Sequence, residues 1–177
     1  MEVSDAYRFC PLCGAGRLTR VPSRPFRCHA CEYTSFFGPV TAVGVVITNA
    51  FGEVLLIERA KEPGKGKLGM PGGFVDPSES AEVALRREIL EEVGLHVGPL
   101  SFLMTAPNAY FYQGVVSPVL DIFFCANIES DQIVSAEATE VSAWMWTIPN
   151  QDVLDRMAFD SNRQALALFL KSQSRVD

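Results

Sequence analysis

Residues 70–95 read MPGGFVDPSESAEVALRREILEEVGL, a glycine-rich loop that leads into a segment rich in helix-forming residues. Asp76 suits the capping position of a helix and Pro77 suits its first turn, so we expect a helix over residues 79–93. Gly94 follows directly, where a residue in the left-handed conformation commonly ends a helix. The stretch therefore predicts a glycine-rich loop followed by a capped helix of about four turns.

Three glutamates share one face of this expected helix. Glu88, Glu91 and Glu92 stand at positions i, i+3 and i+4, which are neighbours on a helical surface. Carboxylates this close repel one another unless a cation lies between them. Mg²⁺ and Mn²⁺ prefer such hard oxygen ligands, and the backbone carbonyl of Gly72 in the preceding loop is a further candidate ligand. A solvated acidic face without a metal is the alternative interpretation.

The loop before the helix carries a basic cluster inside an acidic region. Its members are Arg59, Lys61, Lys65 and Lys67, whereas residues 38–177 together carry a net charge of −8. A metal held by carboxylates beside basic side chains can bind a polyphosphate and stabilise the charge that develops on it during cleavage. We therefore interpret Arg59 and Lys67 as candidate substrate-binding residues.

From Gly73 to Leu95 the chain reads G-x5-E-x7-R-E-I-x-E-E-x-G-L, which resembles the Nudix box, the signature of Nudix hydrolases, at every fixed position. The resemblance covers residues 39–177. It implies an α/β fold, with an α/β/α sandwich around a mixed sheet, and hydrolysis of a nucleoside diphosphate that is linked to another group. ADP-ribose and FAD are the leading substrates under this interpretation, and cleavage is expected to depend on Mg²⁺ or Mn²⁺.

The resemblance also implies roles for individual residues of the box. Glu88, Glu91 and Glu92 would hold the divalent cations. Arg87, together with Glu79, would orient these carboxylates. The general base varies among Nudix hydrolases between a glutamate of the box and an acid on a later loop.

Two acids near the expected last strand are candidates for such a later base. Glu140 lies four residues before Trp144 and resembles the later acid, while Glu137 is the second candidate. For either residue, a solvated loop acid without a catalytic role is the alternative.

The segment after the box bears on the substrate. Where NADH pyrophosphatases carry an SQPWPFP-type sequence, this chain has TAPNAYFY at residues 105–112, which argues against NADH. Tyr112 falls where some dinucleoside polyphosphate hydrolases carry a tyrosine, and its ring is suited to stacking on adenine or flavin. Two further hypotheses stay open: removal of a nucleotide cap from RNA, and a non-catalytic ligand sensor. Such sensors typically lose box carboxylates, and all of them are present here.

Four of the five cysteines form two pairs near the start of the chain. Fourteen residues separate the pairs, a spacing typical of two knuckles that bind one tetrahedral ion through Cys10, Cys13, Cys28 and Cys31. We interpret this ion as structural Zn²⁺; iron, a disulfide framework and a redox dithiol are the alternatives. Cys125 stands alone in an apolar stretch and is interpreted as a core thiol.

The chain is expected to contain two domains. Residues 1–37 would form the zinc ribbon and residues 38–177 the Nudix domain, an arrangement that resembles the NADH-pyrophosphatase-like branch and related FAD or ADP-ribose hydrolases. In the second domain the predicted strands are Thr41–Thr48, Glu53–Glu58, His96–Met104, Val115–Ala126 and Val141–Thr147. A second helix is predicted from Asp160 or Ser161 to about Lys171.

The whole chain has 177 residues and a formal net charge of −6. This acidity argues against broad nucleic-acid binding, although a small polyphosphate stays compatible with it once cations occupy the carboxylates. A capped RNA end is the exception, supported by four arginines of the expected ribbon: Arg17, Arg20, Arg24 and Arg27. No apolar run approaches the roughly 20 residues that cross a bilayer, and no signal peptide is recognisable. We expect a cytoplasmic protein with a small nucleotide partner and no membrane partner, and a homodimer is common among Nudix relatives.

Overall fold

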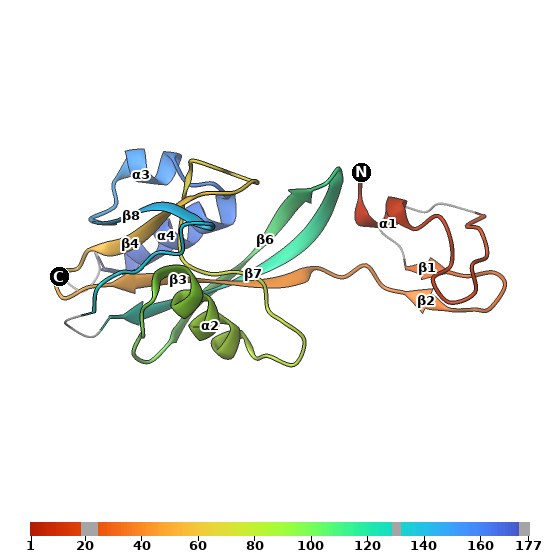
Figure 1. The fold of residues 1–177 in the computed structure, drawn as a ribbon, viewed down its shortest axis with the longest axis horizontal. Coiled ribbons are helices and arrows are strands. Elements are labelled where there is room, and N and C mark those ends of the chain that lie inside the picture. The colour runs from red at the N-terminus through yellow and green to blue at the C-terminus, as the bar shows by residue number, and fades with distance from the viewer. Residues whose placement is uncertain (19–24, 129–131, 174–177) are drawn as a thin grey trace. The chain divides into compact units, whose positions relative to one another are not determined.

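The computed structural model describes residues 1–18, 25–128 and 132–173 of the chain (Figure 1). The chain divides into two compact units. The first comprises Met1–Val40 and Ala109–Val119, and the second comprises Thr41–Asn108 and Leu120–Asp177. The domain boundary expected after residue 37 stays a prediction.

The second unit is built around a six-stranded sheet. The strands follow the order β5-β4-β3-β7-β6, and β8 pairs with β4 outside this path. Because β4 pairs antiparallel with β3, β5 and β8, it lies at the centre of this half of the sheet. The bounds are β3 Val40–Thr48, β4 Val54–Arg59, β5 Leu68–Gly69, β6 Ser101–Tyr112, β7 Val115–Asn127 and β8 Val141–Thr147.

The five predicted strands are confirmed, and their bounds differ most from the prediction at β6. β6 begins at Ser101 rather than at His96 and continues to Tyr112. The two-residue strand β5 was not predicted, because two residues show no alternation of polar and apolar side chains.

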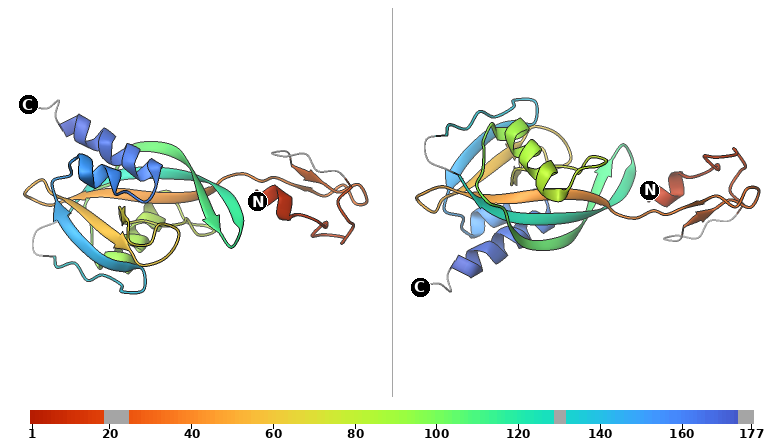
Figure 2. Two further views of the ribbon diagram at one scale, coloured as in Figure 1. Left: turned by 90° about the horizontal axis from the view of Figure 1, so that it is seen from above. Right: turned by 90° about the horizontal axis from the view of Figure 1, so that it is seen from below.

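Two helices cover opposite faces of the sheet (Figure 2): α2, Ala81–Val93, and α4, Asp160–Gln173. The expected sandwich of helices around a sheet is therefore confirmed, as is the expected C-terminal helix. A short helix α3, Gln151–Asp155, was not predicted, since five residues are too few for a periodic pattern. Among the described residues, no helix is long and apolar enough to cross a bilayer.

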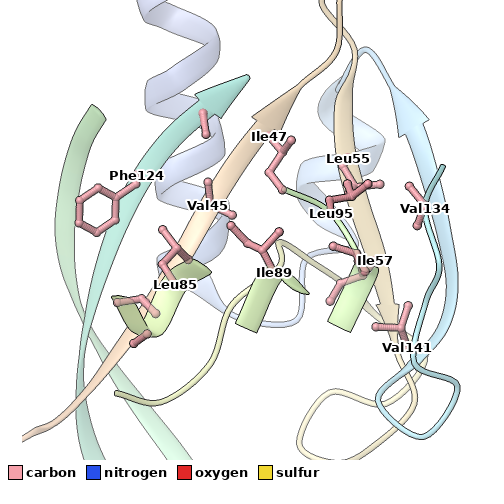
Figure 3. Close-up of a cluster of buried hydrophobic side chains, with 14 residues drawn as sticks. Val45, Ile47, Leu55, Ile57, Leu85, Ile89, Leu95, Phe124, Val134 and Val141 are labelled. Carbon is pink, nitrogen blue, oxygen red and sulfur yellow. The ribbon is translucent and has the colours of Figure 1, made fainter. Parts of the chain in front are cut away.

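The strands β3 and β4 contribute side chains to both layers, because side chains alternate between the two faces of a strand. One core cluster joins these strands to α2 and includes Val45, Leu55 and Ile89 (Figure 3). A second cluster joins the same strands to α4 and includes Val46, Leu56 and Leu166. The helix that carries the three glutamates is thus fixed to the sheet by its own apolar face.

The start of α2 differs from the prediction. The helix begins after Ser80, whose hydroxyl accepts a 3.3 Å hydrogen bond from the backbone N–H of Val83. The preceding residues form a turn instead, in which the Glu79 N–H donates to the Asp76 carbonyl at 3.1 Å. Ser78 adopts φ 74°, in the left-handed region, which interrupts any right-handed helix through this turn. The predicted cap at Asp76 is therefore wrong, and Ser80 takes that place.

The end of α2 agrees with the prediction. Gly94 has φ 67°, and its N–H donates to the Leu90 carbonyl at 3.1 Å. A left-handed residue at this point satisfies a carbonyl of the last turn, which is why glycine suits it.

The first unit has a small core of its own. The buried residues Cys10, Phe26 and Cys28 form this core, and Tyr7 packs against it. Its short elements are α1 Val3–Ala6, β1 Phe26–Arg27 and β2 Thr34–Ser35, and the two strands pair antiparallel. A core of this size lacks the apolar surface that normally stabilises a fold, so a bound metal ion is the expected source of stability.

Candidate active site

The loop after β5 runs along β3 and leaves no room for a side chain at Gly72 or Gly73. The Val45 N–H donates to the Pro71 carbonyl at 3.1 Å, and the Val43 N–H donates to the Gly73 carbonyl at 2.8 Å. Gly72 has φ 146°, and a Cβ atom there would lie 2.1 Å from the carbonyl oxygen of Val43. Only glycine permits this approach of two backbones.

Two glutamates of α2 reach the same loop. The Gly72 N–H donates a 2.9 Å hydrogen bond to Glu92 Oε2. The carboxylate of Glu88 lies beside Gly73, where a Cβ atom would come within 2.5 Å of it. Glu92 is 7% exposed and the Glu88 side chain 14%, whereas the Glu91 side chain is 59% exposed. Two of the three predicted metal ligands are therefore packed against bare backbone, and the third faces solvent.

Burial makes the negative charge on these acids costly. Desolvation raises the pKa of Glu92 to about 8, against the hydrogen bond from Gly72, and the charges of Glu88 and Glu140 raise it further. Burial likewise raises the pKa of Glu88, while hydrogen bonding to Arg87 acts in the opposite direction. A divalent cation would reverse this balance, because its charge favours the ionised carboxylates. In the chemistry of its donors, the site fits Mg²⁺ or Mn²⁺.

Arg87 links three acids of the box. Its Nε and Nη2 each donate to one oxygen of Glu79 at 2.9 Å, a bidentate arrangement. Nη1 donates to Glu88 at 2.8 Å and to Glu91 at 3.0 Å, and Nη2 also reaches the Phe74 carbonyl at 3.1 Å. Hydrogen bonds to Glu79 first, and to Glu88 next, raise the pKa of Arg87. The orienting role of Arg87 and Glu79 stays a prediction, and these are the contacts that it requires.

The three glutamates do not close around a single point. Among the described residues, the four cysteine sulfurs form the one group of three or more potential ligands whose atoms all lie within 4.8 Å of one another. Arg87 instead draws the carboxylates of Glu88 and Glu91 toward its Nη1. Binding of a cation by all three glutamates would require Glu91 to leave Arg87, which costs little for an exposed ion pair. The metal-binding roles of the glutamates and of Gly72 stay predictions.

A turn just before β8 brings two further acids toward α2. The Glu137 N–H donates to the Glu92 carbonyl at 3.0 Å, and the Ala60 N–H donates to the Glu140 carbonyl at 2.9 Å. The Glu137 carboxylate accepts a 3.1 Å hydrogen bond from the Thr139 N–H and so closes its own turn. The charge of Glu140 instead acts on the buried Glu92 and raises its pKa. The role of either acid as the general base stays a prediction.

The two basic residues predicted to bind substrate differ in their surroundings. Arg59 Nε donates to the Pro63 carbonyl at 2.9 Å, and the guanidinium lies over the ring of Phe159, 5.1 Å from its centroid. The positive charge of Arg59 lowers the pKa of Glu92, in opposition to burial. The side chain of Lys67 is exposed, and its backbone carbonyl accepts from the Arg59 N–H at 3.0 Å. Arg59 is thus held in place, whereas Lys67 is free to reorient.

Several predicted contacts belong to the first unit. Tyr112 is 60% exposed at the end of β6, and its role in substrate binding stays a prediction. Arg17 donates to the Ser4 carbonyl at 2.6 Å, so it contributes to the fold of this unit. Arg20 and Arg24 lie outside the described residues.

The four paired cysteines converge as their spacing predicts. The sulfur atoms of Cys10 and Cys31 are 3.7 Å apart, and those of Cys13 and Cys28 are 3.5 Å apart. Zn–S bonds of about 2.3 Å in a tetrahedron give sulfur–sulfur distances of about 3.8 Å, so the arrangement fits zinc. All five cysteines of the chain are free, which excludes the disulfide framework in this structure.

Both cysteine pairs form the same kind of turn. The Gly14 N–H donates to the Cys10 carbonyl at 2.9 Å, and the Glu32 N–H donates to the Cys28 carbonyl at 3.1 Å. Gly14 has φ 75° and Glu32 has φ 60°, so the second knuckle adopts the left-handed conformation without a glycine. A backbone hydrogen bond from Ala30 lowers the pKa of Cys28 to about 6, whereas at Cys31 a hydrogen bond from the Tyr33 backbone is outweighed by burial and the neighbouring cysteine sulfurs, which raise the pKa to about 12.

Sequence reasoning missed two contacts of the basic loop. Phe159, which packs on Arg59, lies at the start of the C-terminal helix, and no local pattern connects them. Lys61 was noted only as a member of the basic cluster, whereas its Nζ lies 3.0 Å from Glu140 Oε1. Lys61 and Glu140 come together through the pairing of β4 with β8, a register that the sequence of neither strand indicates.

The fold and the site define a class of protein. Helices cover both faces of the sheet, and carboxylates of one helix lie against a double-glycine loop. The model of the NUDIX domain family matches residues 38–169. The chain belongs to this family.

Curated relatives share part of the chain. The NAD-capped RNA hydrolase NudC of Stutzerimonas stutzeri is 30% identical over 97 residues, 55% of this chain and 34% of that protein. The ADP-ribose pyrophosphatase of Methanocaldococcus jannaschii is 42% identical over 64 residues, 36% of this chain and 37% of that protein. The chain therefore spans about a third of the length of these relatives.

A solved structure supports the same relationship. The NUDIX domain of Shewanella oneidensis NrtR, complexed with ADP ribose, matches with a TM-score of 0.62 and 26% identity. The match covers 80% of this chain and 91% of that one.

Proposed function

We propose that the chain hydrolyses the pyrophosphate bond of a nucleoside diphosphate linked to another group, and that the reaction depends on Mg²⁺ or Mn²⁺. One observation carries the proposal: the carboxylates of Glu88 and Glu92 are packed against the bare backbone of Gly72 and Gly73. Burying acidic groups this way is costly without a cation, so folding stability alone does not explain the arrangement.

Residues of the box would hold the cations. Glu88, Glu91 and Glu92 would provide carboxylate oxygens, and the Gly72 carbonyl would provide one more. The Gly72 N–H donates to Glu92, so the backbone of residue 72 lies beside this carboxylate, which supports the ligand. When bound, a divalent cation supplies a Lewis acid that neutralises pyrophosphate charge and lowers the pKa of water.

The protein's own groups would then move one proton and orient two reactants. Glu140 would accept a proton from the attacking water, whose oxygen forms a new bond to phosphorus. The bridging P–O bond breaks, and its electron pair leaves with the departing phosphate. Arg59, held by Pro63, and Lys67 would bind the pyrophosphate oxygens.

The substrate we propose carries an ADP group. The relatives are named for ADP-ribose and for NAD-capped RNA, both of which contain ADP joined through a pyrophosphate, as does FAD. The name of the NudC relative makes an RNA cap of NAD type the second candidate.

A substrate screen tests the proposal. ADP-ribose, FAD, NADH, a dinucleoside polyphosphate and NAD-capped RNA would each be incubated with Mg²⁺, and the released nucleotide measured. We expect cleavage of at least one ADP-containing substrate and a loss of at least about 10²-fold in Glu92→Gln. Cleavage of none by the wild-type chain would favour a ligand sensor instead.

We also propose that Cys10, Cys13, Cys28 and Cys31 hold a structural zinc ion. The sulfur spacing and the matching turns of the two pairs support this ligand set. The ion would supply the stability that the small core of the first unit lacks.

A further inference from the structure

We infer that Lys61 is a positioning residue for Glu140, whose carboxylate it contacts directly. The inference rests on the proposed function, in which Glu140 is the general base. Lys61 Nζ lies 3.0 Å from Glu140 Oε1. Neither residue is part of the glutamate-rich box, so their pairing adds a component to the site.

The backbone of Glu140 is fixed independently of its side chain. The Ala60 N–H donates to its carbonyl at 2.9 Å, and its own N–H donates to the Glu137 carbonyl at 3.0 Å. The first of these bonds extends the antiparallel pairing of β4 with β8, in which Arg59 lies opposite Val141. The register therefore brings residues 61 and 140 together, and only the side-chain torsions of Glu140 are left to be set.

Nearby charges would otherwise move this side chain away. The turn that carries Glu140 is bonded to α2, because the Glu137 N–H donates to the Glu92 carbonyl at 3.0 Å, so the like charges of Glu140 and the glutamates of α2 repel one another. Repulsion favours a rotamer of Glu140 that points to solvent. A cation in contact with Glu140 offsets this repulsion, and Lys61 is that cation.

The two arginines near the site have different partners. Arg87 donates to Glu79, Glu88 and Glu91, while Arg59 Nε donates to the Pro63 carbonyl. Division of the charges in this way leaves Lys61 to act on the base, and the box arginine to act on the box acids.

Folding stability does not explain the pair. The side chains of Lys61 and Glu140 are 59% and 45% exposed, and exposed ion pairs contribute little to stability. Removal of Lys61 should therefore leave the fold intact. Because the pair is partly exposed, the Glu140 carboxylate also stays within reach of the attacking water.

Kinetics of five variants test the inference, with ADP-ribose as substrate, or FAD if ADP-ribose is not cleaved, and Mg²⁺. We expect Lys61→Met to lower kcat about tenfold with KM changed less than twofold, and Lys61→Arg to restore most of kcat. In the Glu140→Gln background, Lys61→Met should have no further effect, because Lys61 acts through Glu140. Lys171→Met, an exposed lysine of α4, is the matched control and should keep wild-type kinetics.

A second readout does not depend on activity. Acylation of lysines by a limiting amine-reactive ester, mapped by mass spectrometry, should be slow at Lys61 in the metal-free protein and about threefold or more faster in Glu140→Gln. The contact with Glu140 Oε1 holds the Lys61 nitrogen against the carboxylate and away from the reagent, and Glu140→Gln removes the charge that maintains this contact. The acylation rate of Lys171 should be equal in both proteins.

The outcomes separate this inference from the proposed function. A raised KM with unchanged kcat in Lys61→Met would mean that Lys61 contacts the substrate directly. An equal loss of kcat on Lys61→Met in the wild-type and Glu140→Gln backgrounds would mean that Lys61 acts without Glu140. Either result overturns the inference but leaves the proposed hydrolysis intact. Equal acylation of Lys61 with and without Glu140 overturns the pair itself. If the wild-type chain cleaves nothing, the positioning role falls with the proposed function, and the acylation result still decides whether the pair exists.

Discussion

The backbone N–H of Gly72 donates a 2.9 Å hydrogen bond to the carboxylate of Glu92, which joins the loop after β5 to the last turn of α2. Glu92 is buried, so this bond satisfies an acidic group that water does not reach freely. The bond also fixes the spacing between the loop and the helix. A side chain at residue 72 would collide with the Val43 carbonyl and move the loop, so catalysis by this site would depend on glycine there.

Gly72→Ala should destabilise the second unit strongly. The new Cβ would lie 2.1 Å from the Val43 carbonyl oxygen, and φ 146° is strained for any L residue. We expect a loss of about 2–4 kcal/mol in the free energy of unfolding, measured by urea denaturation. Gly98→Ala is the matched control, because a Cβ there meets only ordinary contact at 3.6 Å. Equal stability of the two variants would contradict the geometry of the glycine loop.

Glu92→Gln should stabilise the protein that has been purified without Mg²⁺. Burial raises the pKa of Glu92 from 4.5 to about 8, so the folded state holds an extra proton between these pH values. Wild-type stability should then fall as pH rises from about 4.5 to about 8 and stay low above it, because ionised Glu92 favours the unfolded chain. Glutamine stays neutral, so at pH 8.5 the variant should be more stable by about 2–4 kcal/mol.

Added Mg²⁺ should reverse that order. Ligands that bind only the folded state raise its melting temperature, and this gain should be present in the wild type and largely absent in Glu92→Gln. Thermal melts at pH 6 and 8.5, with and without Mg²⁺, provide the measurement. A variant that is less stable than the wild type at pH 8.5 without Mg²⁺ would show that the charge of Glu92 is already well compensated.

The contacts that sequence reasoning anticipated join residues that lie close together in the sequence. Arg87 reaches Glu79, Glu88 and Glu91 within one helix and the turn before it, so one motif predicts them together. Lys61 and Glu140 meet only because β4 and β8 pair, and no pattern in either segment indicates that register. Local contacts follow from periodicity, whereas long-range contacts need the order of strands in the sheet.

The helix start illustrates a different limit. Asp76 and Ser80 both suit a cap, and composition alone does not choose between them. The left-handed conformation of Ser78 decides in favour of Ser80. That conformation belongs to a turn in which Glu79 is held by Arg87, a tertiary contact that propensity does not contain.

Arg87→Lys should lower kcat by about 10- to 100-fold, because a lysine does not reproduce bidentate bonds to Glu79 while also reaching Glu88. Arg86→Lys is the neighbouring control. Arg86 donates to the Val97 carbonyl at 2.7 Å and to the Gly98 carbonyl at 3.0 Å, away from the box acids. Arg86→Lys should lower the free energy of unfolding by about 1 kcal/mol and leave kcat unchanged. Similar kcat values for both variants would remove the orienting role from Arg87.

The zinc assignment leads to a prediction about metal content. Elemental analysis of protein purified without chelator should find about one zinc ion per chain, and iron in its place would support the alternative metal. Cys13→Ser should lose the metal, because a hydroxyl is a poor zinc ligand, and Cys13 is exposed, so its loss perturbs packing little. Cys125→Ser should keep its zinc, since Cys125 lies outside the four-sulfur cluster.

Loss of the zinc ion should destabilise the first unit. Among its described residues, the core has three buried side chains, two of which are zinc-ligand candidates, so the metal-free unit should lack enough apolar contact to stay folded. Limited proteolysis of Cys13→Ser should therefore cleave within residues 1–37 much faster than in wild type. The core of the second unit contains no cysteine of the cluster and should keep its own melting transition. Full zinc content and wild-type protease resistance in Cys13→Ser would together contradict the proposal that all four cysteines bind the zinc ion.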